Sequence, residues 1–448
     1  MNGVKFNLNY PVISESDKFY ARAKNLIPSA TQTMAKGPSQ HVNGVSPKYL
    51  LKGKGSHVWD ADGNEYLDYN MAIGPLSLGY CYPVVDEAIK NQLEQGITFS
   101  LMHPLEVEVA EMINKIIPNA ESIRYSKGGA DVTSAAVRLA RAFTKKNKVL
   151  CCGYHGWHDW YVSVTKRNAG IPEEIQNLSY TFNYNDINSL EKSIDSNTAC
   201  VILEPMVFEY PKNNFLAEAS ELCKKNNILL IFDEMWTGFR LEIGGAQEYF
   251  NVVPDLACYS KAVANGMPLS VLTGKREIMD LLDDQVFFYN TFGGEALSLA
   301  AAKATINEIC KNNVPSYLRN LGAKLKNGYN KIAGAMNIEF SKCIGYDART
   351  MIAFNEEYKN PLELKSLMQQ EMLKRGILWS GFHNISYSHT ESEIDYTLNV
   401  YEEVLFILKM AIRDNKVKDM IKGIPVQPLF RKTNVFNNES PRRKQRGI

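Results

Sequence analysis

Short apolar runs recur through the middle third of the chain and predict its fold class. They cover residues 148–152, 199–205, 228–234, 256–260 and 269–274. Several are nearly continuous rather than alternating, which is typical of strands buried on both faces. Between the second and third runs, residues 213–227 carry apolar side chains at helical spacing. This strand–helix–strand succession predicts an α/β fold with a mainly parallel central sheet and helices on both faces.

The two ends of the chain follow other patterns. Residues 16–25 have the pattern of a helix, and strands are expected on both sides of the turn sequence "DADGNE". From about 331 the pattern becomes α+β and closes with a helix over 392–415. A chain of this length suits a large α/β domain with a smaller α+β domain. The expected parts are an N-terminal segment of the small domain (1–75), a large domain (76–330), a C-terminal small domain (331–430) and a polar basic tail (431–448).

Composition narrows the class of protein. The 448 residues carry a net charge of +1, which argues against a nucleic-acid or membrane-surface partner. The chain starts without the pattern of a secretory signal, and no run approaches the roughly 18 to 20 apolar residues of a membrane span. The eight cysteines include no CxxC spacing, so neither a metal site nor a disulfide framework is expected. We expect a cytoplasmic protein with reduced thiols.

Two residues at predicted strand ends indicate the chemistry. Asp233 lies near the end of the apolar run 228–234, and Lys261 directly follows the run 256–260 among small neighbours. Ligands gather beyond the carboxyl ends of parallel strands. Burial lowers the pKa of a lysine, so its neutral amine can form a Schiff base with a carbonyl. Pyridoxal phosphate (PLP) is a carbonyl cofactor that needs such a lysine, an acid to keep its ring nitrogen protonated, and a binding site for its phosphate. Lys261 and Asp233 therefore indicate PLP.

A glycine-rich turn supplies a candidate cradle. Gly128 and Gly129 precede an apolar helical stripe over 132–143, and amides at a helix N-terminus bind phosphate. After the strand 148–152 come Tyr154 and His155, which offer an aromatic ring for a flat cofactor to stack on. Two histidines three residues apart, without nearby Cys or Glu, make a poor metal site, so no metal is expected.

In order and spacing these residues resemble the class III PLP-dependent aminotransferases, especially the branch typified by glutamate-1-semialdehyde 2,1-aminomutase. The resemblance covers nearly the whole chain, and its most specific part is "LLIFDEMWTGFR" followed by "GGAQEYF", "PDL" and "SKAVANGMP". It implies the type I fold of PLP-dependent transferases, with PLP bound in the large domain, Lys261 as the Schiff-base lysine and Asp233 as the partner of the ring nitrogen. It also implies a homodimer with shared active sites. The further cofactor contacts that it implies are the phosphate loop Gly128, Gly129 and Ala130, the ring-stacking pair Tyr154 and His155, Glu204 after the second strand, and Thr291, which reaches the phosphate of the neighbouring subunit.

The chain departs from that family on the substrate side. Lys36 stands where the aminomutase has an arginine, and a lysine cannot form a bidentate fork with a carboxylate. Glu209 replaces an asparagine, and Gly381 replaces a glutamate with His383 close by. The phosphate loop 128–130 also lacks the two hydroxyls that are usual there. These changes around an intact centre favour transamination from an amino-acid donor to a carbonyl acceptor, with Glu209 and His383 meeting its hydroxyls.

Three other readings compete with this one. A true aminomutase would use the same central residues. A binding or scaffold protein without PLP is disfavoured because both Lys261 and Asp233 are retained. A nicotinamide dehydrogenase is disfavoured because no GxGxxG follows a predicted strand. The sequence around the phosphate loop also resembles that of class III enzymes associated with bacterial surface-glycan pathways. This resemblance suggests that the amino acceptor belongs to such a pathway.

Overall fold

The computed structural model describes residues 9–428, which form two compact units. One unit contains residues 9–82 and 316–428, and the other contains residues 83–315. The predicted tail (431–448) lies outside the described residues. The sequence placed the boundaries at 75/76 and 330/331, and the assignment of functional domains to these segments stays a prediction.

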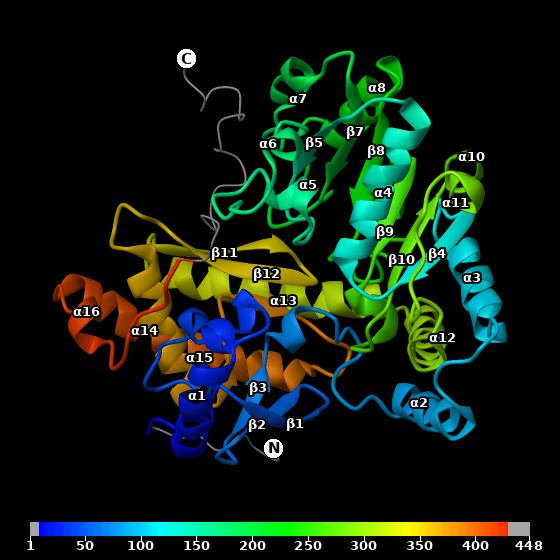
Figure 1. Cartoon of the computed structure of the whole chain (residues 1–448). Coiled ribbons are helices and arrows are strands. Elements are labelled where there is room, and N and C mark those ends of the chain that lie inside the picture. The colour runs from blue at the N-terminus through cyan, green and yellow to red at the C-terminus, as the bar shows by residue number, and fades with distance from the viewer. Residues whose placement is uncertain (1–8, 429–448) are drawn as a thin grey trace. The chain divides into compact units, whose positions relative to one another are not determined.

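The larger unit is built on a seven-stranded sheet (Figure 1). β10 pairs antiparallel with both β4 and β9, and the remaining neighbours are parallel. The mainly parallel sheet is therefore confirmed, and all five apolar runs contain strands. The spatial order is β4 (Ser122–Ser126), β10 (Ser270–Gly274), β9 (Leu256–Tyr259), β8 (Leu229–Asp233), β7 (Thr198–Leu203), β5 (Lys148–Cys152) and β6 (Ser179–Thr181).

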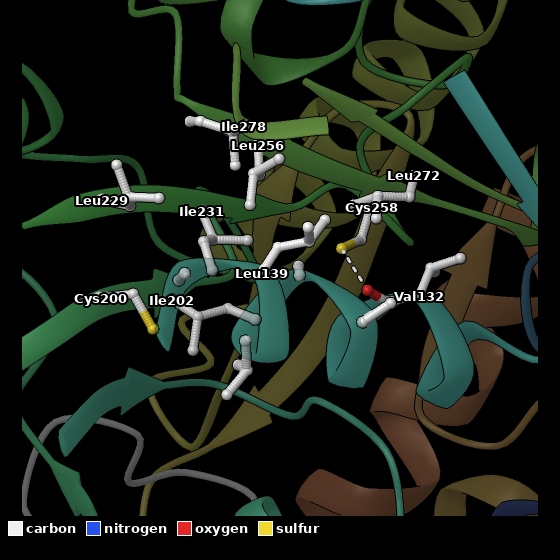
Figure 2. Close-up of a cluster of buried hydrophobic side chains, with 14 of the residues drawn as sticks. Val132, Leu139, Cys200, Ile202, Leu229, Ile231, Leu256, Cys258, Leu272 and Ile278 are labelled. Atoms are coloured by element: carbon white, nitrogen blue, oxygen red, sulfur yellow. Dashed lines mark hydrogen bonds between the residues drawn. The ribbon is translucent and has the colours of Figure 1, made fainter. Parts of the chain in front are cut away.

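Both faces of this sheet are buried. Helix α4 (Gly129–Thr144) covers one face, where its Leu139 packs in a single apolar cluster with Leu229 and Ile231 of β8 (Figure 2). Leu230 and Phe232 alternate with these strand residues and are equally buried, so they face the opposite side. This burial on two faces explains why the strand sequences are continuously apolar rather than alternating.

The helices of the larger unit connect and cover these strands. Helix α8 confirms the helix predicted over 213–227, and α12 packs against α2 and α3. The helices besides α4 are α2 (Pro83–Gln95), α3 (Pro104–Ile116), α5 (Asp159–Val162), α6 (Glu173–Gln176), α7 (Ile187–Ser193), α8 (Phe215–Lys225), α9 (Ala246–Tyr249), α10 (Arg276–Met279), α11 (Leu281–Asp284) and α12 (Ala296–Lys311).

The smaller unit contains two sheets. The first has the order β1 (Leu50–Lys54), β2 (His57–Asp60), β3 (Glu65–Asp68) and β13 (Ile377–Leu378), and the second has the order β11 (Ser341–Tyr346), β12 (Arg349–Phe354) and β14 (Phe382–Asn384). The parallel pairing of β13 with β3 joins the C-terminal part of the chain to the N-terminal part. The longer helices are α1 (Ser14–Leu26), α13 (Val314–Ala335), α14 (Pro361–Lys374) and α15 (Glu391–Arg413), and α16 (Val417–Met420) follows them. Between residues 9 and 428, no helix combines the length and apolar character needed to cross a membrane.

Candidate active site

The sheet topology gathers the predicted cofactor residues at one edge. Because β10 is antiparallel to both of its neighbours, β4 runs in the same direction as β9, β8, β7 and β5. The carboxyl ends of these five strands therefore meet at the same edge, where ligands bind in sheets of this kind. The residues that end or follow these strands include Gly128, Tyr154, Glu204, Asp233 and Lys261.

Asp233 ends β8 and is held on both of its oxygens. Its Oδ2 lies 2.8 Å from Nδ1 of His155, and its Oδ1 accepts a hydrogen bond of 3.1 Å from the amide of Met235. The side chains of Asp233 and His155 are 1% and 0% exposed. A carboxylate at this depth is stable only with partners, because removal from water strongly disfavours an unpaired charge. The imidazole thus orients the acid.

His155 and Tyr154 have different surroundings. The His155 ring lies nearly parallel to Trp160, with centroids 6.1 Å apart and an angle of 16° between the planes. Its Nε2 has no hydrogen-bond partner within the described part of the chain. Tyr154 is half exposed and meets Tyr161 edge to face. Of the predicted ring-stacking pair, the geometry therefore offers Tyr154 to a ligand and uses His155 as the support of Asp233.

Glu204 follows β7 and belongs to the same electrostatic cluster. Burial raises the pKa of its carboxyl group, and the nearby charge of Asp233 raises it further. The charges of His155 and Lys261 and the amide of Tyr154, which donates a hydrogen bond of 2.5 Å, lower that pKa in part. Asp233, His155 and Lys261 therefore all lie within electrostatic range of Glu204.

Lys261 begins the short 3-10 helix η5 (Lys261–Ala264) in a strained conformation. Its φ of +47° is in the left-handed region, which is uncommon for a residue with a long side chain and is typical of functional sites. Its Nζ lies 3.4 Å from the centroid of the Trp236 ring, a cation–π contact. Sequence reasoning missed Trp236, although its place three residues after Asp233 was visible in the motif.

The turn between β4 and α4 has the geometry of an anion cradle. The Asp131 carboxylate accepts hydrogen bonds from the Ser126 hydroxyl (2.7 Å) and the Gly128 amide (2.8 Å). Within residues 9–428, the amides of Gly129 and Ala130 have no hydrogen-bond partner, so they remain available at the positive end of α4.

Two glycines allow other groups to approach this cradle closely. A Cβ on Gly129 would lie 2.9 Å from Sδ of Met235. At Gly156, where φ is +104°, a Cβ would lie 2.5 Å from Cβ of Ala130. Thr133 also links α4 to the segment after β5, because its hydroxyl donates a hydrogen bond of 2.8 Å to the carbonyl of His155. The cradle is thus packed directly against the segments that carry Asp233 and His155.

The segment around Thr291 borders the same turn. Thr291 is exposed, and the neighbouring Asn290 donates a hydrogen bond of 3.0 Å to the Ser126 hydroxyl. Lys127 forms an ion pair of 2.7 Å with Glu295. The predicted contact of Thr291 with a neighbouring subunit's phosphate stays a prediction.

Comparison with known proteins identifies the family. The family model "Aminotransferase class-III" matches residues 40–391. The chain belongs to the class III aminotransferase family. Similar proteins include the 3-aminobutyryl-CoA aminotransferase of Cloacimonas acidaminovorans (32% identity over 89% of this chain and 99% of that protein) and the glutamate-1-semialdehyde 2,1-aminomutase of Methanosarcina acetivorans (34% identity, 88% and 99%). Among solved structures, the FumI protein of Sphingopyxis sp. MTA144, in its PLP internal aldimine form, aligns with a TM-score of 0.82 and 27% identity over 90% of this chain and 97% of that one.

The type I fold of PLP-dependent transferases is thereby confirmed, and the cofactor of this class III enzyme is PLP. The residues of the edge fit that cofactor. Two free amides at the start of α4 suit its phosphate, the buried Asp233 suits its ring nitrogen, and the amine of Lys261 suits its aldehyde. Because the loop 128–130 has no hydroxyl group, its backbone amides would have to hold the phosphate, and Asp131 orders the turn that carries them.

The predicted substrate residues belong to both units. Lys36 and His383 belong to the smaller unit, whereas Glu209 belongs to the larger unit. Lys36 is exposed and lines a cavity, and Glu209 pairs with Lys212. His383 is fully buried, and its ring nitrogens bind Thr350 (2.8 Å) and Tyr401 (2.6 Å). His383 therefore has no ring nitrogen to spare for a substrate hydroxyl, which corrects the expectation for this residue.

The backbone conformation at position 381 explains why a glycine stands there. Its φ is +111°, and a Cβ there would lie 3.1 Å from Cε and 3.2 Å from Nζ of Lys365. A glutamate in this backbone conformation would be strained and crowded. The absence of the acid at this position is thus built into the local fold of the smaller unit.

Proposed function

We propose that this class III enzyme is a transaminase that moves an amino group from an amino-acid donor to a carbonyl acceptor. The observation that carries the proposal is Gly381, whose positive φ and contact with Lys365 disfavour the acid of the aminomutase branch. Lys36 supports it, since a lysine meets an anion as a point charge rather than as a fork. The central residues Asp233 and Lys261 remain as transamination requires.

Each central residue has one role in this proposal. The amides of Gly129 and Ala130 bind the phosphate, and Asp233 holds a proton on the ring nitrogen while His155 orients its carboxylate. When bound, PLP supplies the electron-withdrawing ring that stabilises negative charge on the substrate carbon. Lys261 would hold the aldehyde group of the cofactor through its amine, and as a free amine it would move a proton to or from the substrate carbon. Trp236 positions the Lys261 amine.

The proposal also covers the oligomeric state, the cellular location and the metabolic role of the protein. We infer a cytoplasmic homodimer in which Thr291 of each subunit reaches the phosphate of the other. Residues 76–330 are the PLP-binding domain, and residues 1–75 and 331–430 form the smaller domain. The acceptor is a hydroxylated carbonyl compound of the kind used in surface-glycan metabolism, with Glu209 available to its hydroxyls.

The alternative function is that of an aminomutase, because relatives that align over almost their whole length carry that name. Purified PLP-loaded protein should be incubated with glutamate and a panel of carbonyl acceptors, and separately with glutamate-1-semialdehyde alone. We expect amino transfer in the first reaction and negligible 5-aminolevulinate in the second. Efficient 5-aminolevulinate formation without an external amino donor would establish the mutase instead.

A further inference from the structure

A cavity of about 420 Å³ lies in the smaller unit, apart from any residue assigned to PLP. Its lining comes entirely from residues 19–49, which include helix α1 and the turns after it. The volume is within the range of roughly 300–1,000 Å³ that is usual for small-molecule sites. Lys36, which the sequence singled out on the substrate side, is one of the lining residues.

Two cations that line this cavity form no ion pair within residues 9–428. Arg22 and Lys36 both line it, and neither forms an ion pair or a hydrogen bond within residues 9–428. The third cation, Lys48, is different, because its Nζ binds Asp17 at 2.6 Å and its side chain is 5% exposed. Lys36 does act at longer range on the buried Asp68, because burial raises the pKa of that carboxyl group and the charge of Lys36 lowers it in part. Because neither Arg22 nor Lys36 is held in an ion pair, both can approach a multivalent anion such as a phosphate group.

The rest of the wall is apolar and partly aromatic. Phe19 and Tyr49 lie with ring centroids 5.5 Å apart, and the guanidinium of Arg22 lies 5.6 Å from the Phe19 ring. Phe19 and Leu26 are 41% and 81% exposed. Exposed apolar side chains next to these two cations match a ligand that has both a flat apolar part and an anionic part.

The backbone at this cavity is also unusual. Ser29 and Ala30 have φ values of +59° and +53°, and Ala30 lines the cavity. Consecutive left-handed residues that are not glycine are costly and tend to persist at binding sites. The strained turn ends α1 abruptly, so that the chain returns past the helix and brings Lys36 to the same cavity as Arg22.

We propose that this cavity binds a nucleoside diphosphate group, with the base against Phe19, Leu26 and Tyr49 and the phosphates against Arg22 and Lys36. The identity of the amino acceptor that follows from this rests on the proposed function. The acceptor would be a carbonyl compound attached to a nucleoside diphosphate, and this cavity would bind its nucleotide part. The binding itself requires no turnover. Base stacking on exposed rings and charge-assisted phosphate contacts act at the two ends of one ligand.

The test measures binding of ADP, adenosine and inorganic phosphate to the PLP-loaded protein by titration calorimetry. ADP should bind more tightly than adenosine or phosphate, and Arg22→Gln and Lys36→Gln should each weaken ADP about tenfold, as expected for loss of one charge-assisted contact. Lys18→Gln is the matched control, because Lys18 lies on the same helix outside the cavity and pairs with Glu15. It should leave ADP binding unchanged.

Three results would overturn the proposal: no ADP binding, phosphate bound as tightly as ADP, or ADP binding that Arg22→Gln and Lys36→Gln do not weaken. Circular dichroism of each variant confirms that the fold is retained. The visible absorbance of bound PLP and its response to glutamate report on the proposed function separately. Protein with a normal PLP response but no ADP binding would contradict this inference alone, and ADP binding without a PLP response would contradict the proposed function alone.

Discussion

The Nδ1 atom of His155 lies 2.8 Å from Oδ2 of Asp233, and both side chains are almost completely buried. The acid that we propose for the ring nitrogen of PLP is therefore oriented by an imidazole, which itself packs on Trp160. A buried carboxylate held in this way cannot rotate to a water-solvated position. The pair places an oriented carboxyl group at the edge of the sheet where Lys261 begins its turn.

Replacement of Lys261 by alanine should abolish turnover while the fold is retained. No other amine in the described chain combines a position at the end of β9 with electrostatic coupling to Glu204. The measurements are amino transfer and borohydride trapping of PLP followed by peptide mapping. Lys303→Ala is a suitable control, since Lys303 forms an exposed pair with Glu108. Trapping at the wild-type level in Lys261→Ala would disprove the assignment.

Asp233→Asn should fold and lose most of its rate. An amide cannot hold the proton on the ring nitrogen, so the loss should be several kcal/mol of transition-state stabilisation, with about 1.4 kcal/mol for each factor of ten. Single-turnover kinetics with glutamate measures this loss directly. A rate within twofold of the wild type would remove Asp233 from the site.

Gly156→Ala should weaken PLP retention more than it lowers stability. The added methyl group would lie 2.5 Å from Cβ of Ala130 and would occupy a backbone with φ of +104°, so the phosphate cradle must shift. The measurement is the dissociation constant of PLP after removal and titration back. Gly170→Ala is the matched control, because its φ is +88° but nothing lies within 4 Å of the added atom. Equal PLP affinity in both variants would contradict the role of Gly156.

The His57 imidazole should stabilise the smaller unit in a defined pH window. It joins β2 to β3 and α15, with Nδ1 3.0 Å from Glu65 and Nε2 2.8 Å from Glu393, and its charge lowers the pKa of the nearby His389. Hydrogen bonding to Glu393 raises the pKa of His57 above 6.5. Hydrogen bonds from His57 and Ser56 outweigh burial and lower the pKa of Glu393 from 4.5 to about 2.

The contribution of His57 to the free energy of unfolding is fully present below pH 6.5, and it is lost as the pH rises through the raised pKa of His57 in the folded state. The contribution of Glu393 is complete above pH 4.5 and is lost as the pH falls toward 2. Tm of wild type and His57→Gln should therefore differ most between pH 4.5 and 6.5, by a few degrees at about 2–4 °C per kcal/mol, and converge at high pH. A difference that does not change with pH would refute this account.

Thr291→Val should weaken PLP retention only through the subunit partner. If Thr291 reaches the neighbouring phosphate, dilution of the wild type below its dimer dissociation constant should release PLP to the same extent. Analytical ultracentrifugation together with PLP absorbance at matched concentrations tests this. A fully active monomer, or a Thr291→Val dimer with unchanged PLP affinity, would contradict the shared site.

The apolar runs were sufficient to predict the five central strands and the parallel character of their sheet. Strands buried on both faces need continuous apolar sequence, and this local property survives without knowledge of the neighbours. The position of Asp233 and Lys261 at one edge of the sheet was predictable for a related reason. Once strands are placed in a parallel sheet, residues that follow them must lie at the same edge.

Tertiary packing decided what local patterns could not. His155 was expected to stack on the cofactor, but its ring nitrogen binds Asp233, 78 positions away in the sequence. His383 was expected to meet substrate, but Thr350 and Tyr401 occupy both of its ring nitrogens in the core. Trp236 approaches Lys261 only because β8 and β9 are neighbours in the sheet. The partners of a side chain depend on contacts between segments that are distant in the sequence. The length of a strand and the pattern of its apolar residues depend only on adjacent residues.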